Sequence, residues 1–443
     1  MNPVSGIIAL RSTVSKGTTT IREALQQSFD RAHAAQPRLK AFSHLPATLD
    51  VINNDASAPL AGIAVAVKDL IDTADMPTTY GSPIHRGHVP RQDAWVVQRL
   101  RSLGAHVLGK TVTTEFAWRH PGDTVNPWNT EHTPGGSSSG SAAAVAAGIA
   151  PLGLGTQTLG SVIRPAAYCG IVGFKPSFGS IPRTGVCPLA ESLDHIGLFA
   201  RSLDDVAYAL TLLAGKDASD LHGHPPPAFN AAAVSDALPS PPRIGLLQSQ
   251  LLGEIDAPQK ELINQAAKRF SDAGAEIIDA VLPKEFADAA ELAVAIVAVE
   301  AARIHEARMA QFPQLISAAM RDLIKQGHAI TASEYLALKA RQRAMQQAFA
   351  SWKEANRIDM LLMPPATGEA PKGLHYTGDP RFCSPITLLG VPAITLPAGF
   401  GPKGLPLGVQ LVGSSGADLL LLRVARWCES VLAHERSFPA ILP

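Results

Sequence analysis

Residues 133–176 read TPGGSSSGSAAAVAAGIAPLGLGTQTLGSVIRPAAYCGIVGFKP, and the fold that we expect is organised around them. Two glycine- and serine-rich loops, 135–141 and 155–161, flank a run of small residues at 142–150. That run is typical of a helix packed closely against its neighbours, and 151–154 follow as a short buried strand. Glycine permits positive φ and close backbone approach, and consecutive N–H groups in such loops form anion-binding concavities. A hydrolase needs such a pocket for a developing oxyanion, with serine hydroxyls beside it.

The composition is that of a globular protein without a general attraction to polyanions. The 443 residues are 46% hydrophobic and 17% charged, which allows a large buried core. Lys plus Arg (38) balance Asp plus Glu (38), so neither nucleic acid nor a membrane surface is an expected partner. The four cysteines are scattered, as in a protein with reduced thiols. With no convincing signal peptide and no apolar run long enough for a span, we expect a cytoplasmic protein.

The order of apolar segments predicts an α/β fold, with a large mixed β-sheet flanked by helices. Residues 60–68 are β-branched and apolar up to a final lysine, as in a buried strand, and a helix and second strand follow. Residues 286–356 have a helical pattern and are expected to form a helical subdomain or lid inside one domain of residues 1–443. Further strands are predicted at 243–247, 276–281, 360–363, 385–400 and 405–412.

One interpretation of the chemistry uses the pentapeptide GSSSG at 136–140, which matches G-x-S-x-G. Ser138 would then be a nucleophile on a tight turn, followed in the chain by an acid and a histidine such as His195 or His375. The motif fixes only three positions and lies in a loop rich in serine and glycine. Both histidines are also explained as surface or structural residues.

A second interpretation pairs serines with Lys68, which ends the apolar strand AVAVK. Desolvation there would lower its pKa from about 10.4 toward 7, at a cost of roughly 4–5 kcal/mol. A neutral lysine can take a proton from serine, as in Ser–Lys variants of the catalytic triad. Taken alone, Lys68 is also explained as a strand-end lysine that reaches water or pairs with Asp69.

Three blocks resemble the amidase signature family, whose hydrolases use a Ser–cis-Ser–Lys triad. They are VAVKD at 65–69, GGSSSGS at 135–141 and GTQTLGSVIRPA at 155–166, with NPWNT at 126–130 and SLDHIG at 192–197 as flanking matches. The resemblance runs from about residue 19 to about residue 433. Within the family, SVIRPAAYCG at 161–170 is similar to malonamidase-like bacterial amidases.

The resemblance implies a role for each matching residue. Ser161 is the nucleophile, Ser137 the bridging serine that follows a cis peptide bond, and Lys68 the general base. Backbone N–H groups of Thr158, Leu159, Gly160 and Ser161 are the implied oxyanion donors. Substrate binding is assigned to Arg164, Gly135 and Gly136. An arginine three residues after the nucleophile recognises a substrate carboxylate in malonamidases, and a guanidinium suits bidentate carboxylate binding. Arg164 is equally well explained as a tie between loops.

The sequence departs from the family pattern at two positions. The family's loop before the nucleophile is usually closer to G-G-S, whereas this chain has Leu159-Gly160-Ser161. Leucine resists positive φ, which glycine permits. We expect it to narrow the acyl pocket or reshape the oxyanion loop, unless it simply faces outward. Gln157 stands where aspartate is common, which removes a charge but keeps hydrogen-bonding capacity.

The function expected from these features is an amidohydrolase that cleaves a small, carboxylate-bearing amide through an acyl-enzyme. The first alternative is the A subunit of a glutamyl-tRNA amidotransferase, which shares these motifs and needs partner subunits. The second is a catalytically silent scaffold of the same fold. Family members often dimerise, so a homodimer is a partner state that the resemblance allows. No metal or organic cofactor is implied, since the chain has no HExxH motif, no clustered Cys/His set and no Walker lysine.

Overall fold

The fold is built on one mixed β-sheet. The computed structural model describes residues 3–51, 55–224, 230–248, 253–434 and 437–441. Within these ranges, 11 strands form a single sheet in the order β1-β3-β2-β4-β6-β5-β10-β11-β9-β7-β8. The strands are β1 (Phe42–His44), β2 (Ala64–Lys68), β3 (His106–Thr111), β4 (Leu152–Gln157), β5 (Val172–Lys175), β6 (His195–Ala200), β7 (Arg243–Leu247), β8 (Glu276–Ala280), β9 (Met360–Met363), β10 (Ala393–Phe400) and β11 (Pro406–Val412).

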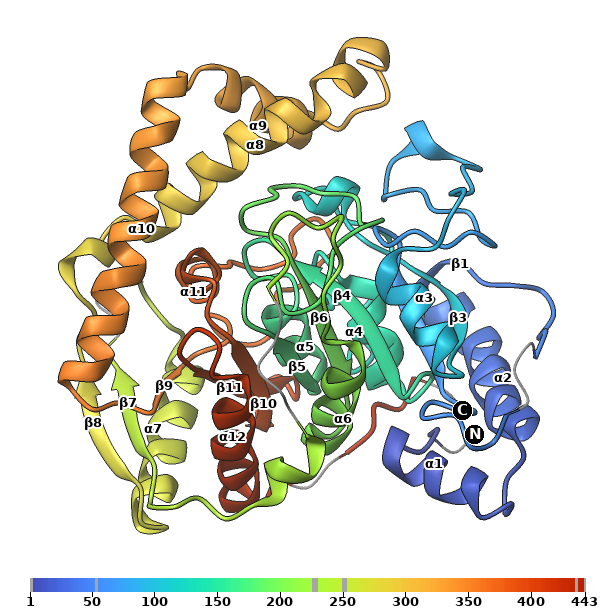
Figure 1. Cartoon of the computed structure of the whole chain (residues 1–443), viewed down its shortest axis with the longest axis horizontal. Helices are drawn as coiled ribbons and strands as arrows, with labels where there is room; N and C mark the ends of the chain where they lie inside the picture. Colours follow the sequence, from blue (N-terminus) through green and yellow to red (C-terminus); the bar gives the residue numbers. More distant parts are fainter. Residues whose placement is uncertain (1–2, 52–54, 225–229, 249–252, 435–436, 442–443) are drawn as a thin grey trace.

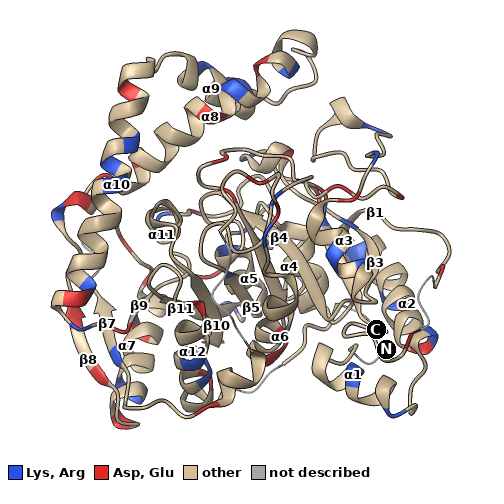
Figure 2. Ribbon diagram, viewed as in Figure 1, with Lys and Arg blue, Asp and Glu red and all other residues tan. Residues whose placement is uncertain are grey.

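Helices flank the sheet, as the sequence predicts. They are α1 (Ile7–Ser15), α2 (Ile21–Leu39), α3 (Trp95–Ser102), α4 (Ser139–Ala146), α5 (Ile163–Cys169), α6 (Leu203–Leu213), α7 (Ala257–Asp272), α8 (Ala289–Gln311), α9 (Ala318–His328), α10 (Ala332–Ala355), α11 (Ser384–Leu389) and α12 (Asp418–Leu432). Basic and acidic residues are interspersed along the outer helices and loops (Figure 2).

The central strands bring the two glycine-rich loops to the same region. β2 pairs in parallel with both β3 and β4, and β4 pairs antiparallel with β6. Every residue of β2 and β4 is buried. Lys68 ends β2, and the second glycine-rich loop begins inside β4 at residue 155. Because Val67 pairs with Leu154 in the parallel register, Lys68 lies beside the start of that loop.

Small residues let α4 and α5 approach the sheet closely. Every residue of both helices is buried. A Cβ added to Gly140 would lie 2.1 Å from the carbonyl oxygen of Ala41 and 2.5 Å from the nitrogen of Val112, so only glycine fits there. The helix expected at 142–150 spans Ser139–Ala146, so it begins and ends earlier than predicted, and the strand expected at 151–154 spans Leu152–Gln157.

Helices α8, α9 and α10 form an arm that stands away from the sheet and is inserted between β8 and β9 (Figure 1). They cover the stretch in which a helical subdomain was expected; that they act as a lid stays a prediction. The strand expected at 385–400 is wrong in its first part, because residues 384–389 form α11 and only 393–400 pair with β11. A short apolar run does not by itself distinguish helix from strand.

Candidate active site

Lys68 is fully buried at the end of β2 and is held by hydroxyl groups. Its Nζ lies 2.7 Å from Ser137 Oγ and 2.8 Å from Thr156 Oγ1, with the Thr156 carbonyl oxygen at 3.4 Å. Burial lowers the pKa of Lys68 well below its usual value, and the nearby Asp194 carboxylate opposes this shift in part. Desolvation penalises the charged form of an amine. The neutral amine that a general base requires is therefore favoured.

Ser137 and Ser161 lie on the two glycine-rich loops. The Gly136–Ser137 peptide bond is cis, as the resemblance implies for the bridging serine. Ser161 lies between β4 and α5 and is 6% exposed. Lys68 thus contacts Ser137 on one loop and Thr156, five residues before Ser161, on the strand that leads to the other.

Arg164 connects these two loops. Its Nε donates to the Thr377 carbonyl oxygen at 2.8 Å, and its Nη2 donates to the Gly136 carbonyl oxygen at 2.7 Å. A Cβ on Gly160 would lie 3.0 Å from Arg164 Nη1, so glycine gives the guanidinium its room. These hydrogen bonds connect separate loops of the chain. They fit a structural role for Arg164, the alternative to carboxylate recognition that the sequence left open. Nη1 itself is buried without a partner among the described residues.

The loop before Ser161 presents unused backbone donors. Among the hydrogen bonds of the described residues, none is donated by the backbone amides of residues 158–161. The next two amides, of Val162 and Ile163, donate to Gln157 Oε1 at 2.9 and 3.1 Å. Gln157 Nε2 in turn donates to Thr387 Oγ1 at 2.9 Å. The glutamine therefore anchors the start of α5, which leaves the preceding amides free for a ligand.

Leu159 does not have the backbone conflict expected of it. It is not among the described residues with positive φ, so a side chain is tolerated. Its carbonyl oxygen accepts from Thr387 Oγ1 at 2.7 Å. The side chain is buried in an apolar cluster that includes Tyr80, Phe116 and Trp118, so it does not face outward.

The structure contradicts the Ser–His interpretation. Ser138 Oγ donates to the Thr156 carbonyl oxygen and accepts from the Thr156 amide, both at 3.2 Å, so this hydroxyl supports β4. His195 Nδ1 bonds the Leu193 carbonyl oxygen at 2.7 Å and its ring packs on Phe178. His375 is exposed. Neither histidine is paired with Ser138.

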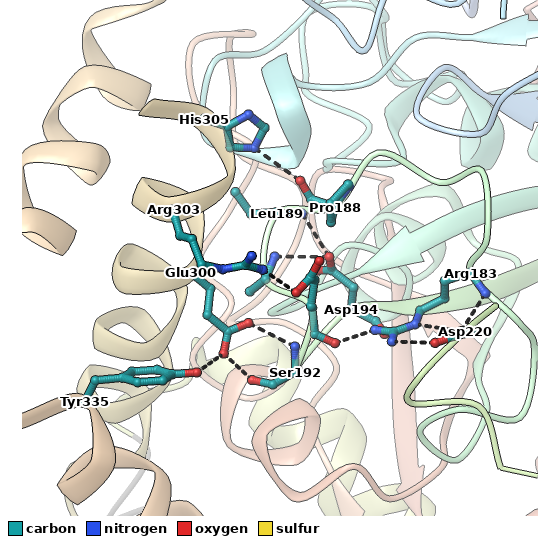
Figure 3. A network of polar contacts seen from close by, with 12 residues as sticks. Arg183, Pro188, Leu189, Ser192, Asp194, Asp220, Glu300, Arg303, His305 and Tyr335 are labelled. Carbon is teal, nitrogen blue, oxygen red and sulfur yellow. Dashed lines mark hydrogen bonds and ion pairs between the residues drawn. The ribbon is translucent and has the colours of Figure 1, made fainter. Parts of the chain in front are cut away.

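Asp194 and Thr156 are site residues that sequence reasoning did not single out. Asp194 is buried and accepts from Thr158 Oγ1 at 2.5 Å. It also accepts from the amides of Leu189 and Ala190 at 2.9 and 3.0 Å (Figure 3 shows Asp194 beside Leu189). Burial raises its pKa to about 6. The motif SLDHIG contained Asp194, but nothing in the sequence showed that its side chain turns toward Thr158.

A cavity of about 200 Å³ lies beside these residues. Thr156 and Thr158 line it next to Lys68, and Ala117, Pro188 and Leu189 form further parts of its wall. Thr158, the first residue of the loop with unused amides, belongs to its lining, and this makes it the candidate substrate cavity. Lys68, Ser137 and Ser161 are not among its lining residues. In the part of the chain that the structure describes, no group of three or more His, Cys, Asp or Glu side chains is arranged to hold a metal ion.

The family model described as Amidase matches residues 23–422. The chain belongs to the amidase family. It is therefore an enzyme that acts on carbon–nitrogen bonds, in keeping with its structural neighbours.

Known amidase-family proteins are similar over most of this chain. The A subunit of glutamyl-tRNA(Gln) amidotransferase from Symbiobacterium thermophilum is 36% identical over 419 residues, which cover 86% of this chain and 85% of that protein. A 6-aminohexanoate cyclic dimer hydrolase, solved with substrate, has a TM-score of 0.88 and 26% identity over the full length of both chains. Native peptide amidase from Stenotrophomonas maltophilia has a TM-score of 0.83 and 28% identity, covering 99% and 98% of the two chains.

These matches support the family but not the narrower likeness to malonamidases, because the relatives named above are an amidotransferase subunit, a cyclic dimer hydrolase and a peptide amidase. Among the described residues of this family member, no helix has the length and apolarity that crossing a membrane requires.

Proposed function

We propose that this protein hydrolyses an amide bond with Ser161 as nucleophile, Ser137 as bridging serine and Lys68 as general base. The observation that carries the proposal is the buried Lys68 amine, held between the hydroxyls of Ser137 and Thr156. Among the described residues, no carboxylate lies at hydrogen-bond distance from Lys68, and burial lowers the pKa of its amine. Base catalysis requires such a neutral amine.

Thr156 orients the neutral amine. A neutral lysine has two N–H bonds and one lone pair, and Thr156 offers two acceptors, Oγ1 and its carbonyl oxygen. If both N–H groups are directed to Thr156, the lone pair faces Ser137. The Ser137 hydroxyl then donates to Lys68 and accepts from Ser161, so it relays the proton as Ser161 attacks.

The proposed reaction proceeds in two steps. In the first, Ser161 Oγ bonds to the carbonyl carbon, its proton passes through Ser137 to Lys68, and the protonated lysine returns a proton to the departing ammonia or amine. In the second, water attacks the acyl-enzyme by the same relay and releases the acid. The free amides of residues 158–161 are the proposed oxyanion donors, each worth about 10²–10³ in turnover.

A small amide, with a carboxylate as one option, is the proposed substrate. The cavity beside Thr156 is small. Arg164 does not line this cavity, but its buried Nη1 has no partner among the described residues. The two other guanidinium nitrogens, Nε and Nη2, donate to backbone carbonyl oxygens, which supports a mainly structural role for Arg164. Carboxylate recognition would therefore rest on Nη1 alone.

A second candidate is the A subunit of a glutamyl-tRNA amidotransferase. It is supported by the 36% identity to such a subunit over most of both chains. In this case Ser161 would release ammonia from an amide donor for use by partner subunits. The first candidate is supported instead by structural similarity to a 6-aminohexanoate cyclic dimer hydrolase over the full chain.

One experiment separates the two candidates. Purified chain is assayed for ammonia release from glutamine and from small neutral and acidic amides, and the same chain is used to capture partners from its own cells. Turnover of small amides by the chain alone supports the hydrolase. Ammonia release only with captured partner subunits supports the amidotransferase, and an inactive chain without partners would refute both.

A further inference from the structure

We infer that His305 of α8 is a specificity-determining residue, because it ties together two walls of the cavity beside Thr156 and Thr158. This inference rests on the proposed function, which makes that cavity the substrate site. One wall contains Ala117, and another contains Pro188 and Leu189. His305 lies outside the cavity lining and contacts the segments that carry both walls.

The contacts of His305 are specific on both sides. Its Nε2 lies 3.2 Å from the Pro188 carbonyl oxygen, and its ring centroid lies 4.6 Å from that of Phe116, the residue before Ala117 (Figure 3 shows the contact with Pro188). Arg308 Nη1 approaches His305 Nδ1 at 3.1 Å. A guanidinium can only donate, so Nδ1 accepts and the ring proton is on Nε2, where Pro188 accepts it.

The ring is held in this neutral form at working pH. His305 is fully buried. Burial, followed by the neighbouring Arg308 cation, lowers its pKa to about 3. His305 therefore acts as a fixed connector between the two walls over the working pH range.

The rest of the arm holds the same two segments. On the loop at residues 187–194, Glu300 accepts from the Ser192 amide at 2.9 Å and from the Ser192 hydroxyl at 2.5 Å, and Arg303 pairs with Glu191 (Figure 3). At residues 114–118, Trp118 Nε1 donates to the Ala319 carbonyl oxygen at 3.2 Å. The arm is thus bound to both walls, and His305 contacts both of them.

The backbone of the first wall needs such support. Phe116 and Ala117 have φ of 45° and 64°, both in the left-handed region that residues with a Cβ rarely occupy. Conformations of this kind persist only where the surroundings enforce them. Arg308 also lies over the Phe116 ring, at 5.5 Å from its centroid. Removing the His305 ring would let this segment relax and widen the cavity.

The test compares His305→Ala with His305→Gln and with His328→Ala, an exposed histidine of the same arm. kcat/KM is measured for a series of linear primary amides from acetamide to hexanamide. In His305→Ala the preference for hexanamide over acetamide should rise by about tenfold or more, the scale set by pocket methylenes. His305→Gln, which can replace both hydrogen bonds, should remain closer to the wild type, and His328→Ala should match it.

Hydrogen–deuterium exchange of residues 114–118 and 187–194 provides a measurement that needs no substrate. Both segments should exchange faster in His305→Ala than in His328→Ala. Unchanged exchange would overturn the inference, and so would faster exchange with an unchanged size preference, since that is the result of a merely structural residue. A wild type that releases no ammonia from any amide would count against the proposed function, while the exchange result would still decide whether His305 connects the two walls.

Discussion

Replacing Thr156 by valine removes one acceptor from the Lys68 amine and keeps the size and the strand propensity of the side chain. The bond that is lost spans 2.8 Å in a fully buried site. An unsatisfied buried donor costs about 1–3 kcal/mol. If this cost falls on the reacting arrangement, kcat should decrease by about 5- to 150-fold, at 1.36 kcal/mol per factor of ten.

The same substitution should shift the pH profile in a defined direction. The Thr156 hydroxyl stabilises the protonated lysine more than the neutral one, so its loss lowers the pKa of Lys68 further. Because the base must be neutral, kcat/KM rises with pH through this pKa. The ascending limb in Thr156→Val should therefore begin at lower pH, with a lower plateau.

The assay is ammonia release over a range of pH for wild type, Thr156→Val and Thr395→Val. Thr395 is a fully buried threonine on β10 whose hydroxyl donates to the Val409 carbonyl oxygen at 3.0 Å, so it matches the chemistry of the change away from Lys68. An unchanged rate and profile in Thr156→Val, or an equal loss in Thr395→Val, would refute the role given to Thr156.

Four further substitutions test other parts of the site. Arg164→Lys should lower kcat/KM about 10- to 150-fold for neutral and acidic amides alike, because lysine can keep only one of the two guanidinium hydrogen bonds and the lost bond is worth about 1.5–3 kcal/mol. A loss confined to acidic amides would indicate carboxylate binding instead. Gln157→Met should reduce the free energy of unfolding in urea by about 2–3 kcal/mol, since two backbone donors lose their acceptor; no change would contradict its anchoring of α5. Leu159→Gly should reduce the free energy of unfolding by roughly 2–5 kcal/mol, as for other buried leucines. It should also change the relative rates at which amides with different acyl groups react. Unchanged relative rates would show that Leu159 does not line the acyl pocket. Burial raises the pKa of Asp194 from 3.8 to about 6, so the folded state holds this proton more tightly than the unfolded state does. The free energy of unfolding should therefore fall by up to roughly 3 kcal/mol as pH rises through that window. Asp194→Asn should abolish this fall, and an unchanged pH dependence would contradict the raised pKa.

Sequence reasoning identified the parts of the site that depend on local pattern. A lysine at the end of an apolar strand predicted a buried amine, and the two glycine-rich loops predicted close packing and free backbone donors. Lys68 and Ser137 are in contact as expected. The G-x-S-x-G match at Ser138 failed because three fixed positions in a loop of serine and glycine carry little information.

Other features depend on contacts between distant segments, which no local pattern encodes. Asp194 bonds Thr158 across 36 positions, and Arg164 bonds Thr377 across 213. The apolar residues of α11 satisfied a strand pattern equally well, and only the tertiary structure determined that they form a helix. The contacts of His305 with the cavity walls likewise arise from the placement of the arm.

Ammonia release by wild type and Ser161→Ala, measured with the same panel of small primary amides, tests the central claim most directly. The proposed mechanism predicts turnover of at least one amide by the wild type and a loss of about 10⁴-fold or more in Ser161→Ala, the scale of removing a serine nucleophile. Ammonia release that survives in Ser161→Ala would contradict the assignment of Ser161 as the nucleophile.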